Sequence, residues 1–147
     1  MSYIYSNYLI QKMSTGYSGT PFIKKLGIKP GMRLRFVHPP DNYSELLGKL
    51  PEEVSFVTSR ESQADFIHLF ARNVQEMEEH LVTLKDEIEK NGMIWVSWYK
   101  KASKIPTDLS EDIIRNTALA LGLVDIKVCA VDEKWSGLKL VWRKENR

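Results

Sequence analysis

The sequence predicts one α/β domain built in three layers, with a mostly parallel sheet and an antiparallel hairpin near the C-terminus. An uninterrupted apolar run at residues 93–98 is typical of a strand covered on both faces. Apolar residues spaced three and four apart between residues 74 and 88 indicate an amphipathic helix. Two further strand-like segments, residues 124–131 and 138–143, are joined by so short a loop that they must pair antiparallel.

The chain begins with an extension, residues 1–15, followed by the predicted domain at residues 16–147. Tyrosines in the extension could pack on the domain or form a contact between copies of the chain, and the sequence leaves both open. Thr20 suits a helix N-cap and Pro21 suits the first helical position, which predicts a short helix ending at Leu26.

The first strand is expected at residues 33–38, with a second helix after it. Pro39 and Pro40 end the strand, because proline cannot donate a hydrogen bond to a neighbouring strand. The helix should begin at Asp41 or the next residue and end near Leu50, with its leucines on the inner face.

Residues 54–58 and 64–70 read as the second and third strands. The link between them is shorter than the connection that parallel strands of one sheet normally need. Two alternatives follow: either the second strand is short and the link passes under its neighbour, or the two strands pair antiparallel.

The apolar spacing predicts a long helix from about Asn73 to Lys90, closed by Asn91 and Gly92. The apolar run that follows is the expected central strand of the sheet. Loops at the carboxyl ends of central strands line the ligand crevice of open α/β sheets. The segment 99–106 is therefore the first place to look for function.

The helix after this loop is expected to begin near Thr107 and to end at Leu121. Asp108 and Glu111 have capping-box spacing, and acids in a first turn complement the helix dipole. Within the loop, Lys100, Lys101, Ser103 and Thr107 could hold a phosphate or carboxylate. The alternative, which the acids at the helix start favour, is that the lysines are solvated or balance those acids.

A second candidate anion site is the start of the expected first helix, where the free amides from Ser18 onward lie near two cations, Lys24 and Lys25. Capping alone also explains the residues there. The third candidate is the hairpin loop, with Asp132, Glu133, Trp135 and Ser136. Its carboxylates could bind a hard cation or act as a base and its aromatic ring could recognise a ligand, but turn formation and core packing explain the same residues.

Composition excludes several classes of function. The formal net charge of +2 implies neither nucleic acid nor an anionic membrane as an obligatory partner. Cys129 is the only cysteine and the three histidines lack ligand-like spacing, so we predict no disulfide and no metal site. No apolar run is long enough to span a membrane and no secretory signal is recognisable, which indicates a cytoplasmic protein. His68 lies in an apolar run and is expected to be a hydrogen-bonded core residue.

The order of elements resembles the Rossmann-like fold of S-adenosylmethionine-dependent methyltransferases. In that family the first strand leads into a glycine-rich turn that approaches the cofactor, and an acidic residue ends the second strand. Here Pro39 and Pro40 replace the glycines, and the second strand ends at Ser59 and Arg60 without the acid. The resemblance therefore implies the scaffold without its cofactor, and we predict that no cofactor is bound.

Three long segments, residues 16–32, 98–115 and 122–141, also resemble a family of small bacterial proteins carried as a domain of unknown function. This resemblance implies a bacterial source and supplies no activity. Our first hypothesis is a non-catalytic binding or regulatory module for a small anionic ligand or a protein. The alternative is a divergent transferase-type enzyme, in which Lys100, Lys101 or Asp132 would assist. A third hypothesis is a homo-oligomer formed through the N-terminal extension.

Overall fold

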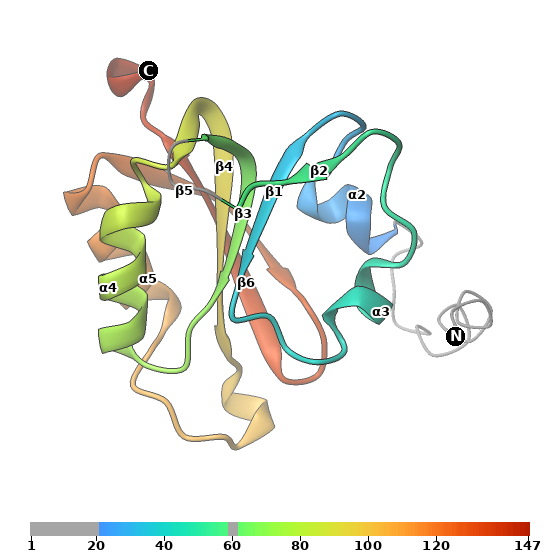
Figure 1. Cartoon of the computed structure of the whole chain (residues 1–147). Coiled ribbons are helices and arrows are strands. Elements are labelled where there is room, and N and C mark those ends of the chain that lie inside the picture. The colour runs from blue at the N-terminus through green and yellow to red at the C-terminus, as the bar shows by residue number, and fades with distance from the viewer. Residues whose placement is uncertain (1–20, 59–61) are drawn as a thin grey trace.

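The computed structural model describes residues 21–58 and 62–147, and these residues form a sheet with helices on both faces (Figure 1). The strand order is β2-β1-β3-β4-β6-β5. The first four strands in this order run parallel, and β6 pairs antiparallel with both β4 and β5. This arrangement confirms the predicted three-layer α/β class. The strands are β1 (Arg33–Val37), β2 (Ser55–Phe56), β3 (Ala64–Phe70), β4 (Ile88–Tyr99), β5 (Leu123–Ala130) and β6 (Trp135–Trp142).

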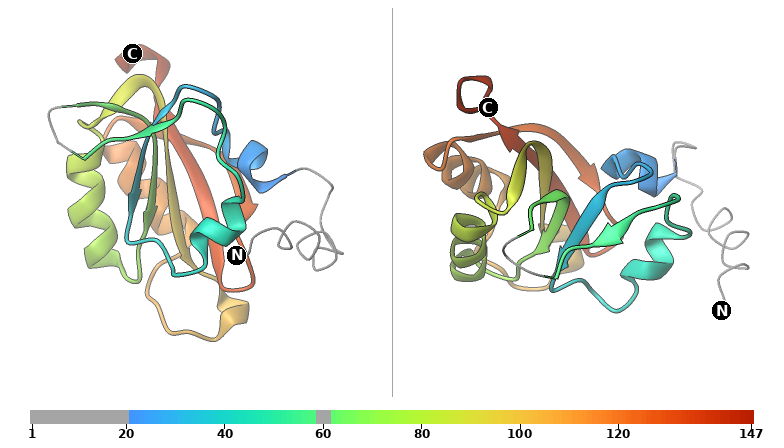
Figure 2. Two further views of the ribbon diagram at one scale, coloured as in Figure 1. Left: turned by 45° about the vertical axis from the view of Figure 1, so that its right-hand side comes forward. Right: turned by 45° about the horizontal axis from the view of Figure 1, so that its top comes forward.

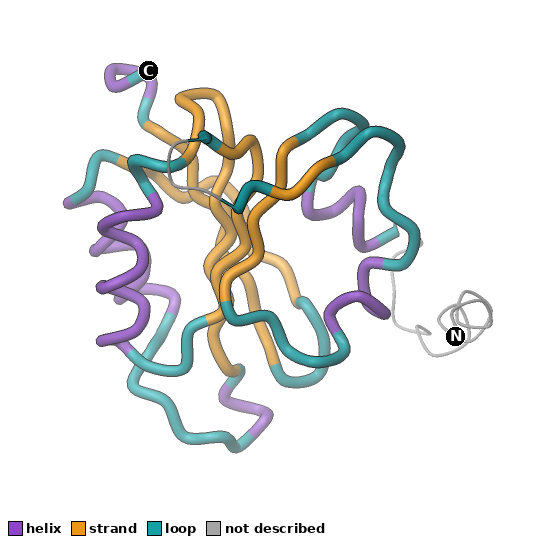
Figure 3. Tube along the Cα trace, viewed as in Figure 1, coloured by secondary structure: helices purple, strands orange, loops and turns teal. Residues whose placement is uncertain are grey.

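The helices lie in two layers, one on each face of the sheet. Helices α2 (Phe22–Leu26) and α3 (Tyr43–Leu47) cover one face, and α4 (Val74–Leu84) and α5 (Glu111–Ala120) cover the other (Figures 2 and 3). Two short 3-10 helices, η1 (Lys101–Ser103) and η2 (Lys144–Asn146), complete the described elements. None of the helices in the described ranges is long and apolar enough to cross a bilayer.

Side chains of β4 alternate between two hydrophobic cores. Ile94 and Val96 join the core that includes Met77 of α4 and Ile114 of α5. Trp95 joins the opposite core, and its indole Nε1 donates a hydrogen bond to the carbonyl oxygen of Leu26 at 2.8 Å. The apolar run is therefore buried on both faces, as the sequence predicted, with one parallel and one antiparallel neighbour.

The structure decides between the two alternatives for the second strand. β2 pairs in parallel only with Arg33 and Leu34, the first two residues of β1. β3 lies on the other side of β1 and places Phe66 opposite Leu34. The end of β2 is thus level with the start of β3, and a short link suffices. The short-strand alternative is correct, and the antiparallel pairing is wrong.

The long helix predicted to reach Lys90 is wrong beyond Leu84. α4 ends at Leu84, and β4 begins at Ile88, which pairs with Ala64 of β3. Gly92 is a buried strand residue and not a helix terminator. A Cβ at this position would lie 2.9 Å from the carbonyl oxygen of Asp65, so the glycine allows the two strands to approach.

Helix starts also differ from the predicted caps. Pro21 is the N-cap of α2 and precedes its first helical residue, while Thr20 lies outside the described residues. The Ser110 hydroxyl caps α5 by accepting a hydrogen bond from the amide of Ile113. The Asp108 carboxylate instead accepts the amide of Val74, at the start of α4, at 2.9 Å. The prediction that Asp108 caps α5 is therefore wrong, because its carboxylate bonds to the first amide of α4.

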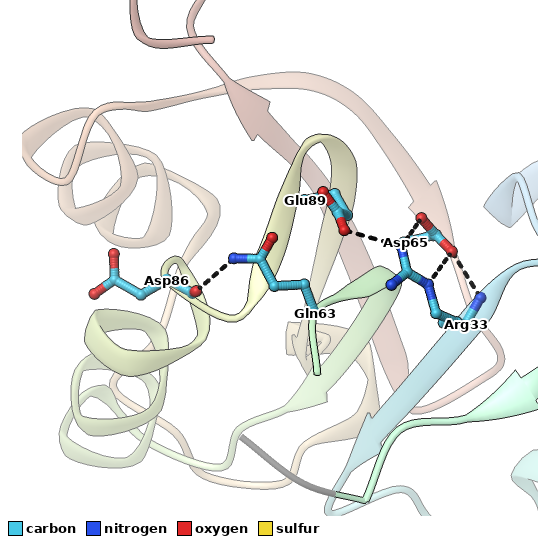
Figure 4. A network of polar contacts seen from close by, with 5 residues as sticks. All are labelled: Arg33, Gln63, Asp65, Asp86 and Glu89. Atoms are coloured by element: carbon cyan, nitrogen blue, oxygen red, sulfur yellow. Dashed lines mark hydrogen bonds and ion pairs between the residues drawn. The ribbon is translucent and has the colours of Figure 1, made fainter. Parts of the chain in front are cut away.

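An ionic network ties together the amino ends of three parallel strands (Figure 4). Arg33 of β1 donates to the Asp65 carboxylate of β3 from Nε and Nη2, both at 3.1 Å, and to Glu89 of β4 at 2.9 Å. Nearby, the Gln63 side chain donates to the carbonyl oxygen of Asp86 at 3.2 Å. These contacts lie at the amino ends of the strands, whereas the ligand crevice of an α/β fold forms at the carboxyl ends. Their role is therefore to hold the register of the strands.

Replacing Gly92 with alanine should destabilise the fold by about 1–3 kcal/mol, because the added methyl would collide with the Asp65 carbonyl and the Ile88 side chain. Urea denaturation at neutral pH measures this change. Asn91→Ala, on the exposed neighbouring position, is the matched control and should change stability little. Equal stability of the two variants would contradict the strand assignment.

Candidate functional site

Two loops that the sequence analysis singled out lie together at the carboxyl edge of the parallel strands. The amide of Lys100, after β4, donates to the carbonyl oxygen of Lys134 in the β5–β6 hairpin at 2.8 Å. The hairpin also lies against the segment after β1, because the Asn42 side-chain amide is 3.4 Å from the Asp132 carboxylate. The sheet thus brings segments far apart in the sequence to one edge.

A cavity of about 280 Å³ opens beside the segment that joins β1 to α3. Aromatic, proline and leucine side chains supply most of its walls, and Asp41 is the only charged residue among those of residues 21–58 and 62–147 that line it. Phe56 of β2 contributes an unusually exposed wall, with 52% of its surface accessible. The cavity therefore suits an apolar or aromatic group. Its principal walls are Phe36, Pro39, Pro40, Tyr43, Leu47 and Phe56.

The Pro39-Pro40 pair shapes this cavity through the backbone. Neither residue has an amide hydrogen, and both rings fix φ, so the segment presents rigid apolar walls where a glycine turn would present donors. The preceding residue, His38, turns the chain out of β1 with φ of +55°, a conformation that side chains other than glycine rarely adopt. This sharp turn directs the prolines toward α3 and away from the strand axis.

A buried polar network connects the cavity wall to the centre of the sheet. The Tyr43 hydroxyl lies 2.6 Å from His68 Nδ1, and His68 Nε2 lies 2.8 Å from the Ser97 hydroxyl oxygen. The three residues come from α3, β3 and β4, so the network holds α3 against two neighbouring strands. The sequence prediction that His68 is a hydrogen-bonded core residue is confirmed.

Burial decides the charge state of this network. His68 is fully buried, which lowers the pKa of its imidazole from 6.5 to about 3, and burial raises the pKa of the Tyr43 hydroxyl. The histidine is therefore neutral at physiological pH. Although Ser97 and His68 are hydrogen bonded as in a nucleophilic enzyme, neither is accessible to a substrate. The network is structural.

The polar residues of the loop after β4 are mostly engaged in local structure. The Ser103 hydroxyl donates to the Lys100 carbonyl at 2.7 Å, and the Thr107 hydroxyl donates to the Arg72 carbonyl at 2.7 Å. Among residues 21–58 and 62–147, no ion pair includes Lys100 or Lys101. Anion binding by these lysines stays a prediction.

The acids expected to balance those lysines have another partner. Arg115 of α5 forms ion pairs with Glu111 and Asp112 in its own helix and with Asp125 of β5 at 3.0 Å. These contacts raise the pKa of the Arg115 guanidinium, first through its hydrogen bond with Asp125. The interpretation that the lysines balance the acids is therefore wrong for the two acids that Arg115 holds.

The hairpin residues divide between turn and core. The Asp132 carboxylate accepts the amides of Lys134 at 2.8 Å and Trp135 at 2.9 Å, which is the turn-forming role. Trp135 is not a loop residue: it begins β6, is 6% exposed and stacks on Tyr99 with ring centroids 4.2 Å apart. It is a core residue because its ring fills the space beside Phe70.

The remaining predicted residues have no shared site. Ser136 lies within β6, Glu133 is exposed in the hairpin, and Lys24 is exposed on α2. Ser18 and the extension at residues 1–15 fall outside the described residues, so the predicted anion site there and the contact between copies stay predictions. Within the described ranges, no three His, Cys, Asp or Glu side chains are placed to bind a metal ion.

Sequence reasoning missed the residues that line the cavity. Phe36 was read only as part of a strand, and Phe56 was assigned to a strand without its exposure. The available signal was the pair of prolines directly after an aromatic strand end, followed by Tyr43. These prolines, which by their lack of amide donors argue against the usual cofactor, also form walls of the cavity.

Comparisons with known proteins give a family and a fold. A family described as "Protein of unknown function (DUF3052)" matches residues 24–144. A search of curated proteins by sequence found no match. Among solved structures, a ribosomal protein L11 methylase from Lactobacillus delbrueckii subsp. bulgaricus has a TM-score of 0.53 and 10% identity over 83% of this chain and 75% of that one.

Two further structures show the same likeness. A magnesium protoporphyrin IX methyltransferase from Synechocystis, solved with bound SAH, has a TM-score of 0.55 and 9% identity, covering 94% of this chain and 81% of its own. A SAM-dependent methyltransferase from Aquifex aeolicus has a TM-score of 0.55 and 14% identity, covering 90% and 96%. At these identities the likeness shows the fold alone, and it confirms the predicted methyltransferase-like fold.

The buried histidine makes stability depend on pH. The unfolded chain binds a proton at His68 near pH 6.5, whereas the folded chain does so only near pH 3, so stability falls as the pH drops through this window. His68→Gln should reduce the slope of the free energy of unfolding against pH by up to ~1.4 kcal/mol per pH unit. Urea unfolding between pH 7 and pH 4.5 measures the slope.

Tyr43→Phe is the matched control for this prediction. It removes a hydrogen bond and should cost about 1–3 kcal/mol at every pH, but it keeps the buried histidine and therefore the slope. An unchanged slope in His68→Gln would show that another group carries the pH dependence.

Proposed function

We propose that this chain, which belongs to the DUF3052 family of proteins of unknown function, is a non-catalytic module that binds an apolar group of a ligand or partner protein beside α3. One observation carries the proposal: an apolar cavity lies at the carboxyl end of β1, next to the point where the chain changes direction across the sheet. Open α/β folds bind their ligands at such points.

The chemistry of the cavity supports an apolar occupant. Pro39 and Pro40 offer no amide donors, and no lysine or arginine of the described residues lines the cavity, so a negatively charged group would lack partners among them. Aromatic walls from Phe36, Tyr43 and Phe56 favour a planar or aliphatic group. Asp41, the one carboxylate among the described residues of the lining, suits a neutral donor or a cation at one end of that group.

The scarcity of reactive groups in the cavity supports binding without catalysis, because Asp41 is the one carboxylate among the described residues of its lining. Its lining, within the described residues, includes no histidine, cysteine or lysine that could act as base or nucleophile. The Tyr43 hydroxyl, which could serve as an acid, is hydrogen bonded to His68 and its pKa is raised by burial. A hydroxyl held in this way stabilises the wall of the cavity.

The second candidate function is a divergent transferase, supported by the likeness to methyltransferases, one of which was solved with bound SAH. An S-adenosyl ligand would occupy the same carboxyl edge. The absence of amide donors at the two prolines is the observation that ranks this candidate second.

Titration with indole and with S-adenosylmethionine, each followed by amide NMR shifts of the full chain, separates the candidates. Indole is the probe for an apolar planar group, and we expect its shifts to concentrate at residues 36–56. Ser44→Trp should fill the cavity and weaken indole binding at least about tenfold. Glu45→Trp, the next residue on α3 and outside the lining, is the matched control and should keep binding.

The transferase would replace our proposal if the natural chain bound S-adenosylmethionine but not indole, and if Ser44→Trp abolished the binding of S-adenosylmethionine. Failure of both probes to shift residues 36–56 would reject the cavity as a binding site for such groups.

A further inference from the structure

Two lysines project from the sheet face that α2 covers and a third follows α2 along the chain, and none of the three lines the cavity beside α3. Lys139 lies on β6, Lys127 lies on β5, and Lys29 follows the C-terminus of α2. Lys127 is anchored to α2 because its Nζ donates to the carbonyl oxygen of Lys25 at 3.2 Å. Lys139 Nζ lies 3.7 Å from the place where a Cβ on Gly27 would be. The Lys139 ammonium group therefore lies close to the C-terminus of α2.

Two of these lysines face each other directly. In the antiparallel β5–β6 pair, Lys127 is the register partner of Lys139, so the two side chains project from the same face of the sheet. Like charges at directly opposite positions destabilise a strand pair. Burial, and then the charges of Lys127 and Lys29, lower the pKa of Lys139. The fold therefore holds these cations together against their repulsion.

The described chain supplies no counter-charge to this group. None of the ion pairs within residues 21–58 and 62–147 includes Lys29, Lys127 or Lys139. Residues 1–20 contain no Asp or Glu, so the N-terminal segment has no carboxylate side chain to offer. An anion that neutralises the group must be supplied by the remaining surface or from outside the chain.

We propose that Lys29, Lys127 and Lys139 form a binding site for a small phosphate-bearing anion. A phosphoryl group carries up to two negative charges and several acceptor oxygens, which match converging ammonium donors better than a single carboxylate does. The overall charge of only +2 favours a small anion over a nucleic-acid backbone, which requires a broad basic surface. The site is separate from the cavity, so either proposal can fail alone.

Isothermal titration of the full chain with inorganic pyrophosphate at low ionic strength tests this site. We expect binding to the natural chain, and we expect Lys139→Met and Lys127→Met each to weaken it at least about tenfold. Lys144→Met, the same change on an exposed lysine of η2, is the matched control and should bind normally. Because Lys127 is exposed, Lys127→Met is expected to fold, and it can test the site even if Lys139→Met does not fold.

Glycerol 3-phosphate in a second titration distinguishes a phosphorylated organic molecule from free pyrophosphate, and tighter binding of either anion supports the site. The melting temperature of ligand-free Lys139→Met is expected to be at or above that of the natural chain, because the change removes a partly buried charge that lies close to another cation. The proposal is overturned if neither anion binds at millimolar concentration, if both lysine variants bind as the natural chain does, or if only duplex DNA binds.

Discussion

The fold depends on burying both faces of β4. Its residues alternate strictly, so that Ile94 and Val96 pack under α4 and α5 while Trp95 packs under α2. The indole of Trp95 also needs a hydrogen-bond partner once buried, and the Leu26 carbonyl at the end of α2 provides it. Both helical layers are therefore required by one strand, and the three-layer architecture follows.

The same requirement for buried polar groups to be satisfied links the core to the cavity. His68 cannot carry a charge at the centre of the sheet, so it stays neutral and bonds to both Tyr43 and Ser97. Tyr43 begins α3 and forms a wall of the cavity, which means that the cavity is held in shape by an interaction within the core. A rigid wall suits recognition of an apolar group, because little freedom is lost on binding.

The segment after β1 shows how one fold can change its chemistry. Solved methyltransferases share this sheet, yet Pro39 and Pro40 present rings at the carboxyl end of β1 where amide donors would suit an anionic or sugar-bearing ligand. The apolar cavity and the lysine group beside α2 then offer two chemically opposite surfaces.

The sequence by itself determined the fold class, the double burial of β4 and the C-terminal antiparallel hairpin, because each depends on local apolar periodicity or loop length. Only the tertiary structure decided that Gly92 belongs to a strand, since its small size matters for contact with Asp65, distant in sequence. It also placed Trp135 in the core and brought Phe56 beside Pro40. Periodicity reports which face a residue occupies, whereas the identity of its neighbours is set by how strands pair across the sheet.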